Sequence, residues 1–161
     1  MRLLALGAEG ARALPGLELT LKKAWAALGS LEVRRVSVGD DARLAARTLA
    51  GWCGRGRADV VLTVGRAGHL PADFAPELAA ALIERQLPGI EERMCLAPPC
   101  RPQDLLFRGR AGLRGTTLIV NLPARAARAA MILRMLAPVV GHALDKARGD
   151  ASECARGGGR G

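Results

Sequence analysis

The stretch Ala58-Asp59-Val60-Val61-Leu62-Thr63-Val64 decides the fold class of this chain. It is almost wholly apolar and rich in β-branched residues, which is typical of a strand covered by helices on both faces. Residues 65–73 follow it, and Pro76 and Glu77 then begin a helical stretch. A buried strand that leads through a loop into a helix is the repeating unit of an α/β fold with a parallel sheet.

The same order of strand and helix recurs on both sides of that stretch. Further strands are predicted over residues 2–7, 31–38 and 116–121, and helices over residues 15–28, 44–52, 76–87, 88–94 and 126–148, the last with a kink at Pro138. This alternation predicts a three-layer α/β/α domain with a mainly parallel sheet over residues 1–148. The Gly-rich residues 149–161 are expected to form a disordered tail.

The charge of the chain is positive and unevenly distributed. The 161 residues carry 24 Lys plus Arg and 15 Asp plus Glu, a net charge of +9, and residues 101–134 hold seven of the basic residues with one acidic residue. Such a field favours an anionic partner: a phosphate-bearing small molecule, a nucleic acid or an acidic protein. Nucleic acid is the least expected of these, because stacking on bases needs aromatic side chains and only 2% of the chain is aromatic.

Membrane insertion and a cysteine metal site are not expected. No uncharged apolar run approaches the ~20 residues that span a bilayer, and the first eight residues are too short for a signal-peptide core, so a cytoplasmic protein is predicted. The four cysteines do not form CxxC pairs, which favours reduced structural thiols over a metal site. They are Cys53, Cys95, Cys100 and Cys154.

Ligands of parallel α/β sheets bind beyond the carboxyl ends of the strands. This rule selects the loops at residues 7–10, 65–73 and 121–125, and it places the turn at Asp40-Asp41 on the same rim. His69 in the second loop is either a solvated side chain or a ligand contact.

The glycines and carboxylates of this rim allow two readings. Gly65 and Gly68 fit a tight turn as well as a loop whose backbone N–H groups face an anion at a helix N-terminus. Asp40, Asp41 and Asp73 suit helix capping, but carboxylates on one rim also suit Mg²⁺ bound together with substrate phosphates. Spacing alone leaves both readings open.

Five arginines carry most of the positive segment: Arg108, Arg110, Arg114, Arg125 and Arg128. A solvated face is the commoner place for such a charge run. However, Arg125 directly follows the end of the predicted strand at residues 116–121, and Arg108 lies in the segment that leads into it. Either side chain is therefore a candidate to contact an anion on the rim.

Several motifs occur in an order that resembles a known family. Residues 63–68 with 71–77 are similar to TxGGTG…RDxTPE, residues 88–94 to PGhxExM, Arg108 with 111–115 to SRxxAGhRG, 117–123 to TLIVNLPGSP, and 38–41 to a VPDD turn. Together they resemble the MogA/MoaB molybdenum-cofactor proteins, which are related to the gephyrin G domain. The resemblance covers residues 1–148 and is strongest from Asp59 to Pro123.

This resemblance implies a MoaB/Mog-like molybdopterin-binding fold, a homotrimer, and a role in molybdenum cofactor biosynthesis beside a molybdenum-insertion enzyme. Active members transfer AMP from Mg-ATP to the terminal phosphate of molybdopterin. Carried across, Asp40 and Asp73 take the positions of the catalytic carboxylates that support Mg²⁺. The implied binding residues are Gly65, Arg66, Gly68, Glu77, Arg108, Asn121, Pro123 and Arg125.

The chain also departs from the family motifs. Arg66, Ala67, Ala72, Ala75 and Phe107 replace Gly, Thr, Arg, Thr and Ser, residues 124–126 replace Gly-Ser-Pro, and residues 7–10 lack the usual Ser-Asp-Arg run. Each change removes a backbone freedom or a hydroxyl that a phosphate could use. Two alternatives follow: a divergent molybdopterin adenylyltransferase in which Arg66 and Arg125 compensate, or a catalytically degenerate protein that binds molybdopterin or a pathway partner.

Overall fold

A six-stranded sheet with strand order β2-β1-β3-β6-β5-β4 forms the centre of the fold. The computed structural model describes residues 1–28, 32–53, 58–98 and 101–149. Strands β2, β1, β3 and β6 run parallel, whereas β5 and β4 pair antiparallel, so the predicted, mainly parallel sheet is confirmed. The strands are β1 (Arg2–Ala5), β2 (Arg34–Ser37), β3 (Val60–Val64), β4 (Arg85–Gln86), β5 (Ala111–Arg114) and β6 (Thr117–Leu122).

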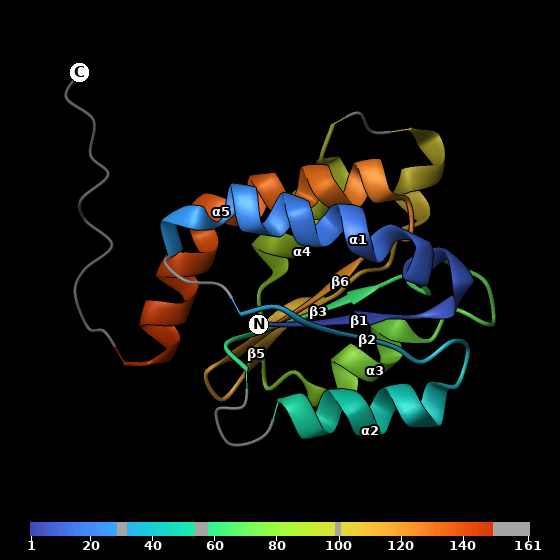
Figure 1. Cartoon of the computed structure of the whole chain (residues 1–161), viewed down its shortest axis with the longest axis horizontal. Coiled ribbons are helices and arrows are strands. Elements are labelled where there is room, and N and C mark those ends of the chain that lie inside the picture. The colour runs from blue at the N-terminus through green and yellow to red at the C-terminus, as the bar shows by residue number, and fades with distance from the viewer. Residues whose placement is uncertain (29–31, 54–57, 99–100, 150–161) are drawn as a thin grey trace.

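Helices cover both faces of the sheet. Figure 1 shows α1 and α5 side by side over one face, with α4 on the same side, and α2 and α3 over the other. The helices are α1 (Gly7–Ala24), α2 (Ala42–Trp52), α3 (Ala75–Leu82), α4 (Pro88–Leu96) and α5 (Ala126–Ala147), with 3-10 turns η1 (Ala26–Leu28) and η2 (Pro102–Leu106). The three-layer architecture follows from this arrangement.

Burial on both faces explains why the sequence of strand β3 is almost continuously apolar. All five of its residues are buried, and alternate side chains point to opposite faces of the sheet. Leu62 and Val64 lie in the cluster shared with α1 and α5, and Val61 lies in the cluster shared with α2 and α3. Both hydrophobic cores therefore depend on this one strand.

Helix α1 begins earlier than predicted. It starts at Gly7 instead of Pro15, so the predicted loop at residues 7–10 is its first turn. Gly7 has a φ of 70° and its N–H donates to the carbonyl of Gly39 at 2.7 Å, which lets the chain pass directly from β1 into the helix. Pro15 lies within the helix, whose burial against the sheet and α5 outweighs the hydrogen bond that a proline removes.

The sequence did not indicate β4 and β5. Helix α3 ends at Leu82 instead of residue 87, and β4 then pairs with β5, which in turn pairs with β6. β4 has only two residues, and β5 is joined to β6 by a turn at Gly115, where φ is 54°. Such short strands show no periodicity, because pairing along a sheet edge stabilises them instead of their own pattern.

Helix α5 ends within one residue of the prediction and includes Pro138. Figure 1 shows its C-terminal part turning away from the direction of its first half, as the predicted kink requires. By length and composition it is the one described helix that could cross a membrane, but it is a core helix: Ile132 and Leu133 are fully buried, and the Trp25 indole donates to the Leu133 carbonyl at 2.8 Å. The predicted tail lies, except for Gly149, outside the described residues.

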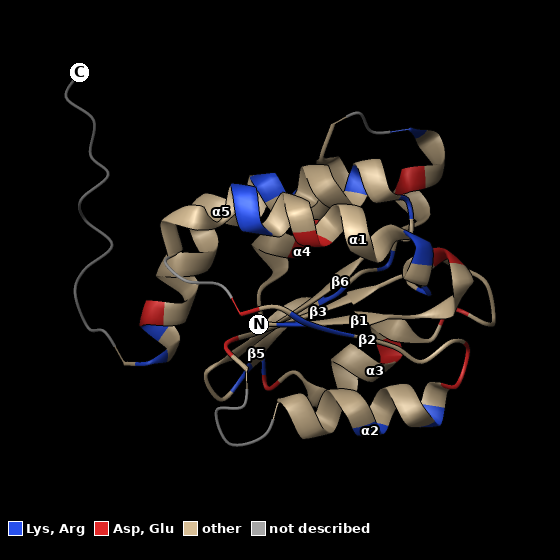
Figure 2. Ribbon diagram, in the orientation of Figure 1, with Lys and Arg blue, Asp and Glu red and all other residues tan. Residues whose placement is uncertain are grey.

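Basic side chains are spread over the molecule. Figure 2 shows Lys and Arg on α1, α2, α5 and β2, in both helical layers, with acidic residues between them. The surplus of positive charge in the sequence therefore does not gather on a single face.

Candidate functional site

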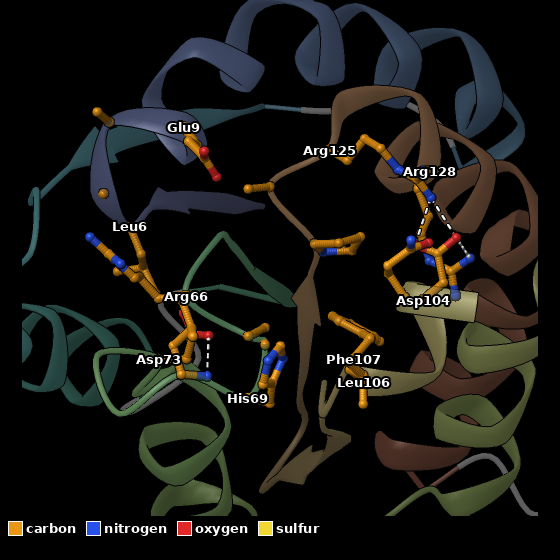
Figure 3. Close-up of a pocket in the computed structure, with 18 of the residues that line it drawn as sticks. Leu6, Glu9, Arg66, His69, Asp73, Asp104, Leu106, Phe107, Arg125 and Arg128 are labelled. Atoms are coloured by element: carbon orange, nitrogen blue, oxygen red, sulfur yellow. Dashed lines mark hydrogen bonds and ion pairs between the residues drawn. The ribbon is translucent and has the colours of Figure 1, made fainter. Parts of the chain in front are cut away.

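A pocket of about 760 Å³ opens beyond the carboxyl ends of β1, β3 and β6. The loops that follow these strands line it, as the rim rule predicts. Figure 3 shows Arg66, His69 and Asp73 on one side and Asp104, Arg125 and Arg128 on the other. Of the predicted site residues, the lining includes Asp40, Arg66, Gly68, Asp73, Pro123 and Arg125.

The Arg66 side chain joins two loops at the edge of this pocket. Its Nε and Nη2 atoms both donate to Oδ1 of Asp40, at 2.9 and 2.6 Å. The pair lies against Gly7, where an added Cβ would be 3.0 Å from both Arg66 Nε and Asp40 Oδ1. Arg66 also has a φ of 51°, the one positive value outside glycine among the described residues. Asp40 is thus held by the Arg66 guanidinium.

Of the two other predicted rim aspartates, Asp41 caps a helix and Asp73 lines the pocket. Asp41 is the N-cap of α2 and accepts from the Leu44 N–H at 2.9 Å. Asp73 lines the pocket, and its Oδ2 accepts from the Leu70 N–H at 3.0 Å. A Cβ on Gly68 would be 2.7 Å from that oxygen, so Gly68 makes room for a carboxylate.

The opposite side of the pocket contains two residues that sequence reasoning did not place in the site, Asp104 and Arg128. Arg125 Nη2 lies 2.7 and 2.5 Å from the oxygens of Asp104, and Arg128 Nη1 lies 3.1 Å from the same carboxylate. The local sequence signal that could have indicated Asp104 is a proline followed two residues later by a capping carboxylate, in Arg101-Pro102-Gln103-Asp104.

Arg128 is a buried cation, with a side chain 2% exposed. It donates to the carbonyls of Met94, Cys95 and Ala97 at 2.9, 2.9 and 3.2 Å. Its Nε is buried and has no hydrogen-bond partner in the described part of the chain. Arg128 is therefore a structural clamp between α5 and the end of α4, and not part of a solvated face.

Four predicted binding residues do not line this pocket. Arg108 pairs with Glu77 at 2.6 Å and donates to the carbonyls of Gly68 and Asp73, so it supports the loop after β3 from outside. The hydrogen bond from Arg108 lowers the pKa of the Glu77 carboxyl. Both residues line a second pocket of about 650 Å³.

Asn121 and Gly65 act within the fold. Asn121 is fully buried, donates to Thr63 Oγ1 at 2.8 Å and accepts from the Arg110 N–H at 2.9 Å. Gly65 has a φ of 96°, and a Cβ there would be 2.4 Å from the Leu6 carbonyl oxygen. They lock the neighbouring strands and let two chain segments cross closely, which makes both positioning residues for the pocket.

The described cysteines do not line this pocket. Cys53 and Cys95 form no disulfide, and burial raises the pKa of the Cys53 thiol to about 11. Cys100 and Cys154 lie outside the described residues. Within the described part of the chain, no group of three or more His, Cys, Asp and Glu is arranged to hold a metal ion.

The arrangement suits a ligand with an anionic end and an apolar body. Arg66 keeps N–H groups that no described residue accepts, and the N-terminus of α5, which has no acidic residue in its first turn, begins beside the lining residue Arg125. Leu106 and Phe107 supply apolar surface between the two charged sides. Charge neutralisation and positioning are the two tasks that phosphoryl chemistry requires.

Comparison with known proteins agrees with this geometry. Residues 18–142 match the family described as "Probable molybdopterin binding domain". The chain is 29% identical over 119 residues to a Helicobacter pylori molybdopterin adenylyltransferase, covering 73% of this chain and 68% of that protein. Its fold is similar to the Thermus thermophilus MoaB enzyme (TM-score 0.75, 32% identity, 92% and 95% covered) and the Mycobacterium ulcerans Mog protein (TM-score 0.78, 27% identity, 91% and 97% covered). The chain therefore belongs to the molybdopterin-binding domain family of molybdenum cofactor biosynthesis, which includes the MoaB and Mog proteins.

Proposed function

We propose that this protein binds molybdopterin in the pocket beyond β1, β3 and β6, as a cytoplasmic component of molybdenum cofactor biosynthesis. The observation that carries the proposal is that Arg66 on one side, and Arg125 with the α5 N-terminus on the other, line one pocket in a chain of this family. The terminal phosphate of the ligand is bound by Arg66, whose remaining N–H groups have no acceptor among the described residues. The pterin packs against Leu106 and Phe107.

Adenylylation of the bound molybdopterin is the second candidate function, favoured by the identity to the H. pylori adenylyltransferase. A terminal phosphate oxygen of molybdopterin attacks the α-phosphorus of ATP, a P–O–P bridge forms, and the bond to the β-phosphate oxygen breaks to release pyrophosphate. Arg66 and Arg125 neutralise charge on the phosphates, and Asp73 holds the loop after β3 in place.

Mg²⁺ at Asp40 and Asp73 is not supported by the contacts of these carboxylates. Oδ1 of Asp40 already accepts two N–H groups from Arg66, and Oδ2 of Asp73 accepts a backbone N–H. A divalent ion at Asp40 would have to displace the guanidinium or tolerate it nearby. The residues present therefore do not form a metal site as they stand.

The test is incubation with molybdopterin and Mg-ATP, followed by chromatography for adenylylated molybdopterin. Adenylyl transfer predicts a product that is lost in Asp73→Ala and kept in Asp145→Ala, an exposed carboxylate on α5. Tight molybdopterin binding without product would favour the degenerate alternative, a binding protein of the same pathway. Absence of both binding and product would contradict the proposed function.

The homotrimer and the molybdenum-insertion partner remain predictions. Light scattering during size-exclusion chromatography measures the first directly, and a mass of three chains would support it. Co-elution with an insertion enzyme, in the presence and absence of molybdopterin, tests the second.

A further inference from the structure

The contact between Arg66 and Asp40 carries an inference about how the pocket binds phosphate. We propose that the Arg66 guanidinium takes the place of a divalent cation at Asp40, so that this protein binds the phosphate of its ligand without Mg²⁺. The inference rests on the proposed function, since it concerns the phosphate of the same ligand. This role gives a function to the Arg66–Asp40 ion pair, whose two charges otherwise only neutralise each other at the edge of the pocket.

The contacts of Arg66 leave part of its guanidinium available to a ligand. Two N–H groups of Arg66 converge on one oxygen of Asp40, and the remaining N–H groups have no acceptor among the described residues. Arg66 and Asp40 both line the pocket. The guanidinium is thus fixed on a carboxylate while part of its donor set stays available to a second anion, which is how a metal ion bridges a carboxylate and a phosphate.

The Arg66–Asp40 pair packs closely against backbone. Gly7 lies directly beneath it, and a side chain there would press against both Arg66 Nε and Asp40 Oδ1 at 3.0 Å. The first turn of α1 and the loops after β2 and β3 therefore meet around the Arg66 guanidinium. Arg66 also adopts a left-handed backbone conformation that arginine rarely takes, and such conformations persist where the surrounding structure holds them.

The positive charge of Arg66 opposes the binding of a second cation at Asp40. A Mg²⁺ ion bound to either oxygen of Asp40 would lie only ~4 to 6 Å from the guanidinium, and repulsion between the two cations would oppose binding. Arginine keeps its charge at all relevant pH values and donates in a planar fork that matches phosphate oxygens. Charge neutralisation at this position is therefore built into the chain.

The experiment measures molybdopterin affinity by anaerobic fluorescence titration, in excess EDTA and in excess Mg²⁺. The wild-type dissociation constant is expected to change by less than about twofold between the two conditions, which corresponds to less than ~0.4 kcal/mol. Arg66→Gly is expected to bind at least about tenfold more weakly in EDTA, because charge-assisted hydrogen bonds are lost, and to recover in Mg²⁺ once Asp40 is free.

Two comparisons make the result decisive. Arg66→Gly suits a left-handed backbone position, so the variant is expected to fold, and calorimetry should show Mg²⁺ binding to it but not to the wild type. Arg148→Ala is the matched control, because it removes a guanidinium from an exposed ion pair with Asp59, which precedes β3, whereas Arg66 follows the other end of that strand.

Each outcome has one meaning. Loss of wild-type affinity in EDTA, or an Arg66→Gly variant that binds as tightly as the wild type in EDTA, would overturn the inference and leave the proposed function standing. Failure of the wild type to bind molybdopterin in either condition would instead overturn the proposed function.

Discussion

Arg128 shows at the scale of one residue that a charge run in a sequence can be structural. Its side chain is buried, donates to three carbonyls and pairs with Asp104. The sequence presents it as one more arginine in a positive segment. Its role depends on α5 packing against the end of α4, which no local pattern reports.

Replacing Arg128 is expected to destabilise the protein strongly. Arg128→Met leaves three buried carbonyls without their donor, and we expect a loss of at least about 3 kcal/mol in the free energy of unfolding. Urea denaturation measures it. Arg134→Met, an exposed position on the same helix, is the control and should change stability by less than about 0.5 kcal/mol. Equal effects of the two substitutions would contradict the structural role of Arg128.

Asp104 is expected to make stability depend on acidic pH. Burial on its own raises the pKa of the Asp104 carboxyl, but the Arg101 backbone N–H and the Arg125 guanidinium together lower that pKa below its ordinary value. The folded state then binds fewer protons than the unfolded chain, so stability is present above about pH 4 and falls as the pH drops through the lowered pKa.

The measurement is the free energy of unfolding between neutral pH and strong acid. Asp104→Asn should be less stable than the wild type at neutral pH and should lose less stability on acidification. Asp145→Asn, which removes an exposed carboxylate, should keep the wild-type dependence. A wild-type acid limb that is unchanged by Asp104→Asn would rule out this assignment.

At the scale of elements, the contact between α1 and β3 depends on one glycine. A Cβ on Gly10 would lie 2.2 Å from the Val64 carbonyl oxygen, whereas a Cβ on Gly16 in the same helix meets nothing within 4 Å. The first turn of α1 therefore approaches the strand that precedes the pocket loop more closely than any side chain would allow. The two glycines form a matched pair.

Gly10→Ala is expected to destabilise the protein by about 2 kcal/mol or more, because the helix must move off the strand. Gly16→Ala is expected to stabilise it by about 0.5 to 1 kcal/mol, because alanine loses less backbone entropy in a helix. Thermal and urea unfolding of both variants measure the difference. Destabilisation by Gly16→Ala as large as that by Gly10→Ala would show that the helix is sensitive to any substitution.

At the scale of the whole molecule, much of the positive charge is already neutralised. Within the positive segment, Arg108, Arg110, Arg125 and Arg128 each pair with a carboxylate. The basic residues are also spread over both helical layers (Figure 2). The basic residues are therefore not confined to the positive segment, and four arginines of that segment are paired with carboxylates.

Weak binding to nucleic acid with little salt dependence is the expected consequence. Fluorescence anisotropy with single-stranded and duplex DNA should give a slope of log K against log salt no steeper than about −2, since few phosphates would be neutralised at once. Molybdopterin binding under the same salts is the comparison. A slope steeper than about −5 would show that the basic residues act together on a phosphate backbone.

Sequence reasoning predicted the parallel part of the sheet and most of the helices, because each of these elements carries its own periodicity. It missed β4 and β5, and it started α1 at Pro15 because proline favours a first turn. For the site, it selected the three rim loops and placed Asp40, Arg66, Asp73 and Arg125 among the candidates. It missed Asp104 and Arg128, whose partners lie far away along the chain.

The sequence by itself determined the α/β class, the family and the rim on which the pocket lies, because buried strands, helix faces and ordered motifs are properties of contiguous residues. Only the tertiary structure decided which charges meet. Arg66 contacts Asp40 across 26 positions, and Arg125 contacts Asp104 across 21. Such pairs form because loops from separate strands meet in the folded chain. Residues so far apart in sequence show no local pattern that would predict their contact.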